Sequence, residues 1–144
     1  MVEYQTDIFG GRVEVKPEET TDFFSAEGKT FDGNIFILTD AIGARDKRQA
    51  WVLYRKALLS GQAAEEIFWR VTWIVKSMHL ASRTKDFTET DMKEFPYRKA
   101  KQFNKNFKEG ELENISESLV VGYHNARRGL EEIELLLEKV ILGL

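Results

Sequence analysis

Apolar residues recur every three or four positions from residue 34 to the C-terminus, which is the spacing of amphipathic helices. Only two prolines interrupt the chain, so long helices are permitted. The pattern predicts an all-α bundle of about five to seven helices. Their apolar faces, in chain order, are Ile35, Phe36, Leu38, Ala41 and Ile42; Ala50, Leu53, Tyr54, Ala57 and Leu58; Ile67, Val71, Ile74, Val75, Met78 and Ala81; Tyr97, Ala100, Phe103 and Phe107; Leu112, Ile115, Leu119, Tyr123 and Ala126; and Leu130, Ile133, Leu137, Val140 and Ile141.

Capping residues set the expected ends of the first helices. Gly43 is expected to end the first helix. Asp46, with Gln49 three residues later, predicts an N-cap for the next helix. Gly61 then predicts the end of that helix.

Three further residues mark boundaries in the second half of the chain. Pro96 suits the first position of a helix, since its missing N–H has no partner there. Gly110 is expected to close that helix. Gly129 costs about 1 kcal/mol inside a helix, so a break is expected there with a new helix after it.

The first thirty-three residues are less regular. Residues 7–15 alternate apolar and polar like a short strand, with a glycine pair that could turn. Lys16-Pro17-Glu18-Glu19 resembles a helix start, which predicts a short helix through Phe23 and Phe24. Gly28 and Gly33 predict a loop. We therefore expect an irregular N-terminal arm over residues 1–33 and a helical domain over residues 34–144.

Composition excludes several classes of protein. The 144 residues are 42% hydrophobic and 31% charged, as in ordinary globular domains. The absence of cysteine excludes disulfides, thiolate metal sites and cysteine nucleophiles. The N-terminus has neither a basic nor an apolar leader segment, and no apolar run approaches the roughly 20 residues of a spanning helix. We expect a cytoplasmic protein with no membrane partner.

Basic residues concentrate over residues 93–108, where six cations accompany one acid. Such a segment can contact a polyanion, with Arg98, Lys99, Lys101 and Lys105 as candidate contacts. It can also be the solvated face of an amphipathic helix. The second interpretation is favoured because Phe103 and Phe107 interleave at helical spacing, and stacking on bases would require these rings to be exposed.

Trp69 and Trp73 lie four residues apart, on one flank of a predicted helix. Large aromatic side chains at such positions more often complete the core. If exposed, they are candidate interface anchors, because tryptophan is enriched at binding hot spots. The cations Arg45, Lys47 and Arg48 are further candidate interface residues.

Motifs for chemistry are absent or incomplete. Gly28-Lys29-Thr30 ends like a phosphate-binding loop, but that loop needs a glycine where Phe23 stands. His79 and His124 have no ligand partner at metal-binding spacing on their own helices. We expect no catalytic residues, no cofactor, no metal and no small-molecule substrate. An unrecognised enzyme would require a polar pocket in which His79 or His124 lies beside a carboxylate.

The order of several weak motifs resembles a known family. Ile35–Ala41 has an apolar-Phe-x-Leu-x-Asp-Ala pattern, and the next predicted helix ends in Leu58-Leu59-Ser60-Gly61-Gln62. A long helix over residues 64–82, the helix start Phe95-Pro96-Tyr97 and two last helices over residues 112–142 follow. In this order they are similar to the C-terminal collar domain of the bacterial DNA polymerase III delta subunit, part of the clamp loader.

The resemblance implies a non-catalytic module that packs against other clamp-loader subunits in DNA replication. ATP hydrolysis would belong to those subunits, and DNA would be met indirectly through the complex. Gln62 replaces the family's usual Glu. The family's ATPase-like domain has no counterpart in these residues, so no clamp-contacting residue is carried over. Residues 1–33 are a candidate remnant of its lid domain. The alternative hypothesis is a stand-alone helical nucleic-acid-binding protein that uses residues 93–108.

Overall fold

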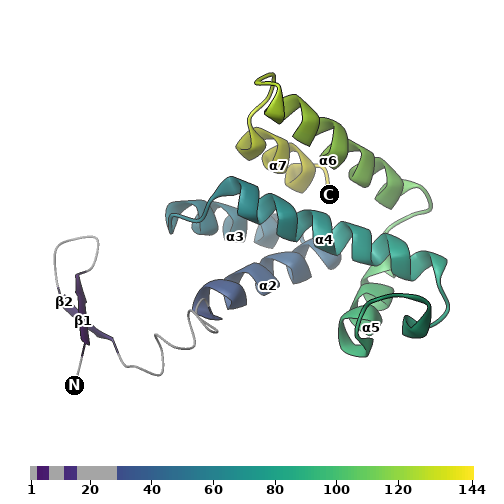
Figure 1. Cartoon of the computed structure of the whole chain (residues 1–144), viewed down its shortest axis with the longest axis horizontal. Coiled ribbons are helices and arrows are strands. Elements are labelled where there is room, and N and C mark those ends of the chain that lie inside the picture. Colours follow the sequence, from purple (N-terminus) through teal and green to yellow (C-terminus); the bar gives the residue numbers. More distant parts are fainter. Residues whose placement is uncertain (1–2, 7–11, 16–28) are drawn as a thin grey trace. The chain divides into compact units, whose positions relative to one another are not determined.

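A computed structural model gives the architecture of the chain (Figure 1). It describes residues 3–6, 12–15 and 29–144, with side chains from residue 36 onward. The chain divides into two compact units, Met1–Phe36 and Ile37–Leu144. The interpretation of residues 1–33 as a lid-domain remnant stays a prediction.

The first unit contains a regular antiparallel pair of short strands, β1 (Glu3–Thr6) and β2 (Arg12–Val15). The register places Glu3 opposite Val15 and Thr6 opposite Arg12. The strand predicted over residues 7–15 is therefore confirmed over its second half. The arm is not irregular where the structure describes it.

Other predictions for the arm have different outcomes. Residues 7–11 and the helix predicted through Phe23 and Phe24 lie outside the described residues. The loop predicted to reach Gly33 is wrong, because helix α2 (Lys29–Gly43) already includes this glycine. A single glycine costs a helix only about 1 kcal/mol, which the surrounding turns can offset.

The all-α prediction is confirmed, with six α-helices in the part of the chain that the structure describes. Two short 3₁₀ turns, η1 (Phe87–Glu89) and η2 (Asn104–Asn106), flank the fourth of them. After α2 the helices are α3 (Lys47–Leu59), α4 (Ala64–Arg83), α5 (Glu94–Phe103), α6 (Glu111–Arg127) and α7 (Ile133–Leu142).

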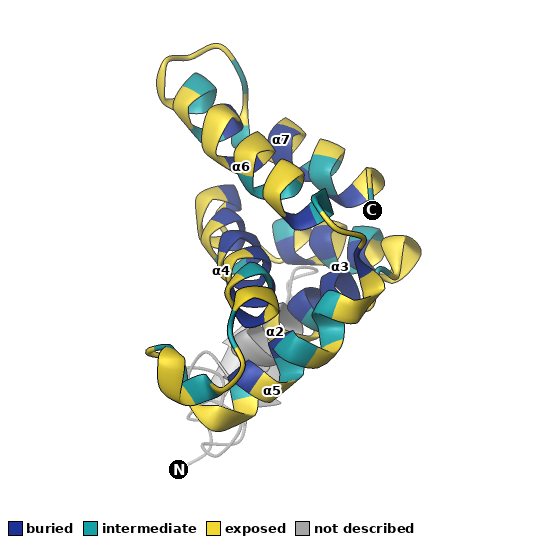
Figure 2. Ribbon diagram, turned by 90° about the vertical axis from the view of Figure 1, so that its right-hand side faces the viewer, coloured by how far each residue is buried: buried dark blue, intermediate teal, exposed yellow. Residues whose placement is uncertain are grey.

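Helix α4 forms the centre of the second unit and packs against α3, α5, α6 and α7 (Figure 1). Its predicted apolar face is buried from Ile67 to Ala81, and Phe68 is buried beside it. The buried positions of all these helices converge on one core (Figure 2). Burial of this stripe, rather than intrinsic helix propensity, is the main source of helix stability here.

The predicted caps of the second unit are mostly confirmed. Asp46 Oδ1 accepts a hydrogen bond from the backbone N–H of Gln49 at 3.1 Å. At the other end of α3, Gly61 has φ of +93° and donates to Leu58, while Gln62 donates to Ala57. This is the Schellman arrangement that glycine favours after a helix.

The break predicted at Gly129 is confirmed by the same arrangement. Gly129 has φ of +76° and donates its N–H to Ala126, and Leu130 donates to Asn125. Helix α6 ends just before it, and α7 begins four residues later. Leu130, predicted to join the apolar face of α7, is exposed because it lies in this connection.

The boundaries of α5 differ from prediction. Pro96 occupies the third helical position rather than the first, since α5 begins at Glu94. The helix ends at Phe103, so Phe107 reaches the core from beyond η2. Gly110, with φ of +85°, precedes α6 as its N-cap and does not close α5. Pro96 is tolerated at this position because the N–H groups of a first helical turn have no intrahelical acceptor.

Candidate interaction surface

Trp69 and Trp73 lie on the solvent side of α4. Their exposed fractions are 50% and 43%, so the interpretation of these side chains as core is wrong. The physical reason is the width of the buried stripe. Residues such as Ile67, Val71 and Ile74 occupy the buried stripe of α4, and the two tryptophans lie at the edge of this stripe.

The Trp69 ring is held in place by other aromatic rings. It meets Phe68 edge-on at 5.1 Å between centroids and lies 5.1 Å from the ring of Tyr123 on α6. Tyr123 stacks on Phe68 at 5.0 Å, and its hydroxyl donates to Glu65 Oε1 at 3.1 Å. Edge-to-face and stacked pairs of this kind favour fixed geometry. Trp69 is therefore both exposed and ordered.

Neighbouring apolar side chains extend this surface. Leu80 lies seven residues after Trp73, two turns along the same side of α4, and is exposed. Val120 of α6 is also exposed, and it lies on the stripe that includes Tyr123 and faces α4. We call Trp69, Trp73, Leu80 and Val120 the tryptophan surface. Sequence reasoning missed Leu80 and Val120, although the spacing of Leu80 from Trp73 was a usable signal.

The second candidate group, Arg45, Lys47 and Arg48, is divided by the structure. Arg45 is a structural residue, because its Nη1 donates to Glu111 Oε1 at 2.8 Å and to the Asn106 carbonyl at 3.3 Å. Its guanidinium also lies 4.8 Å from the centroid of the Phe107 ring. Lys47 and Arg48 point to solvent from the first turn of α3.

Hydrogen bonds to the Glu111 carboxylate lower its pKa. The backbone N–H of Lys108 donates to Glu111 Oε1 at 2.6 Å, and this bond is the main cause that lowers the carboxyl pKa. The hydrogen bond from Arg45 lowers the pKa of Glu111 further. Glu111 therefore stays ionised while it ties α6 to the loop before α3.

Most of the predicted polyanion contacts are engaged within the protein. Arg98 pairs with Glu94 at 2.5 Å, and Lys99 pairs with Asp40 at 2.8 Å. Lys101 donates to the Ala81 carbonyl at 2.8 Å and also to the carbonyl of Thr84. Lys105 has no such partner in the described part of the chain.

The aromatic rings of this segment do not form a stacking platform. Phe103 packs partly buried against the core, and Phe107 is buried. Arg98, Lys101 and Lys105 nevertheless line one cavity of about 490 Å³, which also contains Lys85, Asp86 and Glu94. Two carboxylates offset the positive charge there. The geometry favours the interpretation of residues 93–108 as a solvated helix face.

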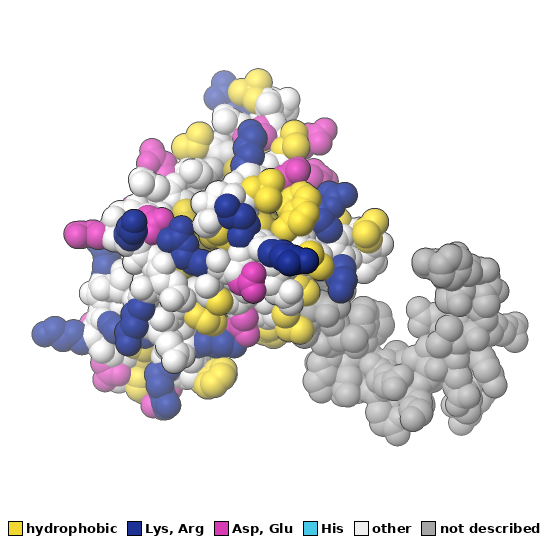
Figure 3. All heavy atoms as spheres, turned by 180° about the vertical axis from the view of Figure 1, so that it is seen from behind, with side chains coloured by type: hydrophobic (Ala, Val, Ile, Leu, Met, Phe, Trp, Pro, Cys, Tyr) yellow, Lys and Arg dark blue, Asp and Glu magenta, His cyan; other side chains and the backbone are white. Residues whose placement is uncertain are grey.

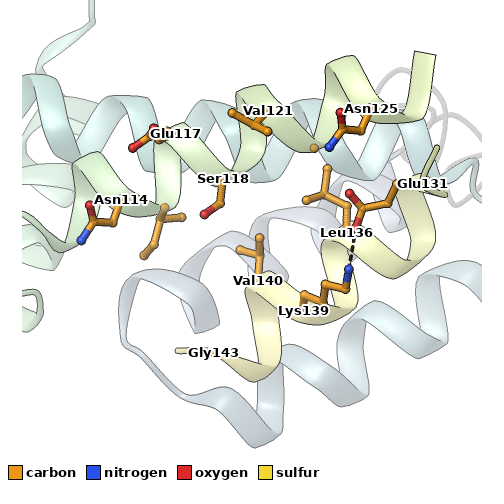
Figure 4. A pocket seen from close by; sticks show the side chains of 12 residues that line it. Asn114, Glu117, Ser118, Val121, Asn125, Glu131, Leu136, Lys139, Val140 and Gly143 are labelled. Carbon is orange, nitrogen blue, oxygen red and sulfur yellow. Dashed lines mark hydrogen bonds and ion pairs between the residues drawn. The ribbon is translucent and has the colours of Figure 1, made fainter. Parts of the chain in front are cut away.

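A larger groove of about 690 Å³ lies between α6 and α7 (Figure 4). Its walls mix amide, hydroxyl and apolar side chains, and the Glu131–Lys139 pair spans one end at 2.8 Å. The remaining lining residues are Asn114, Ile115, Glu117, Ser118, Val121, Gly122, Asn125, Leu136, Val140 and Gly143. The groove has two carboxylates, Glu117 and Glu131. Glu131 is already paired with Lys139.

The two histidines occupy different settings. His79 Nε2 lies 3.0 Å from Glu113 Oε1, an interhelical pair that the sequence could not show. The pair is on the surface. Neither residue lines the two cavities described above, or a further one between the ends of α4, α6 and α7. His124 is exposed. Among the described residues, no group of three or more His, Cys, Asp or Glu side chains could hold a metal ion.

No described helix is both long and apolar enough to cross a membrane. Comparisons with models of protein families, with curated proteins and with solved structures gave no match to this chain.

Proposed function

We propose that this chain is a non-catalytic assembly module, which docks on partner proteins through the tryptophan surface. The observation that carries the proposal is the exposure of Trp69 and Trp73 on a rigid helix. Two large indole rings at the surface raise the free energy of the isolated chain, because their apolar area stays in contact with water. Burial in an interface removes this cost.

The setting of Trp69 also favours tight docking. The ring is already ordered by Phe68 and Tyr123, so binding loses little side-chain entropy there. Tryptophan is among the residues most enriched at hot spots, where a few side chains supply most of the binding energy. Leu80 and Val120 add further exposed apolar area that a partner could cover.

The specific partners that we propose are the other subunits of a bacterial DNA polymerase III clamp loader, in the cytoplasm. This step rests on the resemblance of residues 35–62, 64–82 and 95–142 to the delta-subunit collar domain. The helical order of the second unit is compatible with that role. The chain would supply packing surface, while ATP hydrolysis would belong to its neighbours.

Co-purification with the cognate ATPase subunits tests this function. The full chain should form a complex with them in analytical ultracentrifugation, and the double variant Trp69→Ala, Trp73→Ala should weaken it by at least about 100-fold, as expected for hot-spot residues. Leu130→Ala is the matched control, since Leu130 is an exposed leucine of the connection before α7. It should leave the complex unchanged.

Two results would contradict the proposal. One is the absence of any complex with the wild-type chain. The other is a complex that the double tryptophan variant still forms at full affinity, with circular dichroism showing that its helices are intact. The alternative, nucleic-acid binding by residues 93–108, is weakened by the internal partners of Arg98, Lys99 and Lys101.

A further inference from the structure

Helix α3 has an unusual charge composition. Residues 41–64 contain five cations and a single acid, Asp46, whose carboxylate already caps the helix. Within α3 itself, four residues are basic and none is acidic. Since the whole chain has a net charge of −3, this local excess is not a consequence of its overall composition.

The four cations of α3 all point to solvent. Lys47 and Arg48 are in the first turn, and Arg55 and Lys56 lie two turns further on. None of them lies within 4 Å of a carboxylate among the described residues, whereas Arg45, Arg98, Lys99 and Lys139 do form such pairs. We call these four side chains the α3 cation face.

The arrangement costs the isolated protein free energy. Lys47 and Arg48 are adjacent like charges at a helix N-terminus, where the helix dipole is positive and favours acids instead. The neighbouring helix α7 contains two acids, Glu134 and Glu138, whose charges raise the pKa of Tyr54 while that of Arg55 lowers it. Neither forms an ion pair with α3 in the described structure. Among the described residues, the α3 cation face therefore has no carboxylate within ion-pair distance.

The spacing of the cations is compatible with duplex DNA. Arg55 follows Lys47 by eight positions, and Lys56 follows Arg48 by eight, which is about 12 Å along a helix. The major groove of B-form DNA is also about 12 Å wide, with phosphates along both borders. One pair of cations can therefore contact each border. The guanidinium carbon of Arg55 lies over the Trp51 ring, 5.6 Å from the ring centroid.

We propose that the α3 cation face binds the phosphate backbone of duplex DNA, with Lys47 and Arg48 on one strand and Arg55 and Lys56 on the other. Val52 and Leu59, which are exposed on the same side, would lie against the groove. Figure 3 views the body from the side of α3 and shows Lys and Arg side chains beside apolar ones, with some Asp and Glu side chains among them. The site is distinct from the tryptophan surface, which is built on α4 and α6.

Fluorescence anisotropy with a labelled 20-base-pair duplex of arbitrary sequence tests the proposal on the full chain. Four phosphate contacts predict a slope of about −3.6 in a plot of log affinity against log salt, or a loss of about 150-fold between 50 and 200 mM salt. The variant Lys47→Gln, Arg48→Gln, Arg55→Gln, Lys56→Gln should lower affinity at 50 mM salt by at least about 100-fold and flatten the slope.

A charge-matched control removes four cations elsewhere: Lys93→Gln, Arg98→Gln, Lys105→Gln, Lys108→Gln. It should retain binding within about threefold, and circular dichroism should show both variants to be helical. The proposal is overturned if the wild type does not bind, if the α3 variant binds equally well, or if both variants lose affinity equally. Loss of the ATPase-subunit complex in the α3 variant, without DNA binding by the wild type, would identify an acidic protein partner instead.

This test is separable from the test of the proposed function. The double variant of Trp69 and Trp73 should keep its affinity for DNA, and the α3 variant should keep its protein partners. Failure of one proposal therefore leaves the other measurable.

Discussion

Gly122 of α6 packs directly against Leu136 of α7. A Cβ atom built on Gly122 would lie 2.3 Å from Cδ1 of Leu136, closer than side-chain carbons approach in proteins. Both residues are buried, and both line the groove between the two helices. The absence of a side chain at residue 122 therefore sets how closely α6 and α7 approach.

Gly122→Val should force the two helices apart and destabilise the protein by about 1–3 kcal/mol, the usual cost of overpacking. The gain in helix propensity over glycine only partly offsets this cost. Urea unfolding followed by circular dichroism measures the difference. Val121→Ala, at the exposed neighbouring position, should change stability by no more than about 0.5 kcal/mol. A stabilised Gly122→Val variant would show that the helices do not meet at this residue.

Arg45 has φ of +57°, which costs a residue with a Cβ atom about 1–2 kcal/mol. Both Arg45→Ala and Arg45→Gly remove the contacts with Glu111 and Phe107, but only the glycine variant also relieves this strain. Arg45→Gly should therefore be about 1 kcal/mol more stable than Arg45→Ala. Thermal unfolding of the two variants side by side gives the difference directly. Equal stabilities would mean that the backbone here is not left-handed in solution.

Thr72 of α4 is buried, and its hydroxyl oxygen has no hydrogen-bond partner in the described structure. Thr72→Val keeps the shape and removes the unsatisfied group, so we expect a gain of about 1 kcal/mol in the free energy of unfolding. Thr90 provides a control of opposite sign. Its hydroxyl donates to the Phe87 carbonyl at 2.8 Å and accepts from the N–H of Met92, so Thr90→Val should lose about 1 kcal/mol. A loss in Thr72→Val would reveal a partner for its hydroxyl.

The hydroxyl of Tyr54 is buried and donates to the Glu134 carbonyl at 2.8 Å. Burial, followed by the nearby charge of Glu134, raises the pKa of Tyr54 from 10.0 to about 12. The folded state binds the Tyr54 proton more tightly than the unfolded state does, and this difference stabilises the protein fully below pH 10. The stabilisation, about 2 kcal/mol, is lost as the pH rises toward 12.

Tyr54→Phe should lose this part of the alkaline dependence, and at neutral pH it should lose about 1 kcal/mol with the hydrogen bond. Denaturant unfolding of both proteins at pH 8, 10 and 11 provides the comparison, since the other tyrosines cancel in the difference. Parallel stability curves at all three values would contradict a buried, proton-retaining Tyr54.

Local signals predicted the helices well, because the caps act over a few residues. Asp46, Gly61 and Gly129 each form the capping contacts that their chemistry favours. Helical periodicity alone did not predict which side chains are buried. Trp69 and Trp73 lie next to the buried stripe of α4, and the position of its edge depends on how closely α6 approaches α4.

Contacts between distant residues were beyond sequence reasoning. Lys99 meets Asp40 across 59 positions, and Arg45 meets Glu111 across 66. Such pairs decide which cations are available to a ligand, so residues 93–108 appeared more basic in the sequence than they are at the surface. The cations of α3 are the reverse case, because none of them forms an ion pair within the part of the chain that the structure describes.

The central position of α4 couples recognition to folding. Since this helix contacts four others, it cannot melt without exposing the interior of the whole body, and unfolding of residues 37–144 should be a single transition. A partner protein that binds the exposed side of α4 would therefore stabilise the whole of residues 37–144. The gain in the free energy of unfolding grows with the logarithm of the partner's concentration. The fraction of the chain that stays folded would then depend on the concentration of its partner proteins as well as on the packing of its own core.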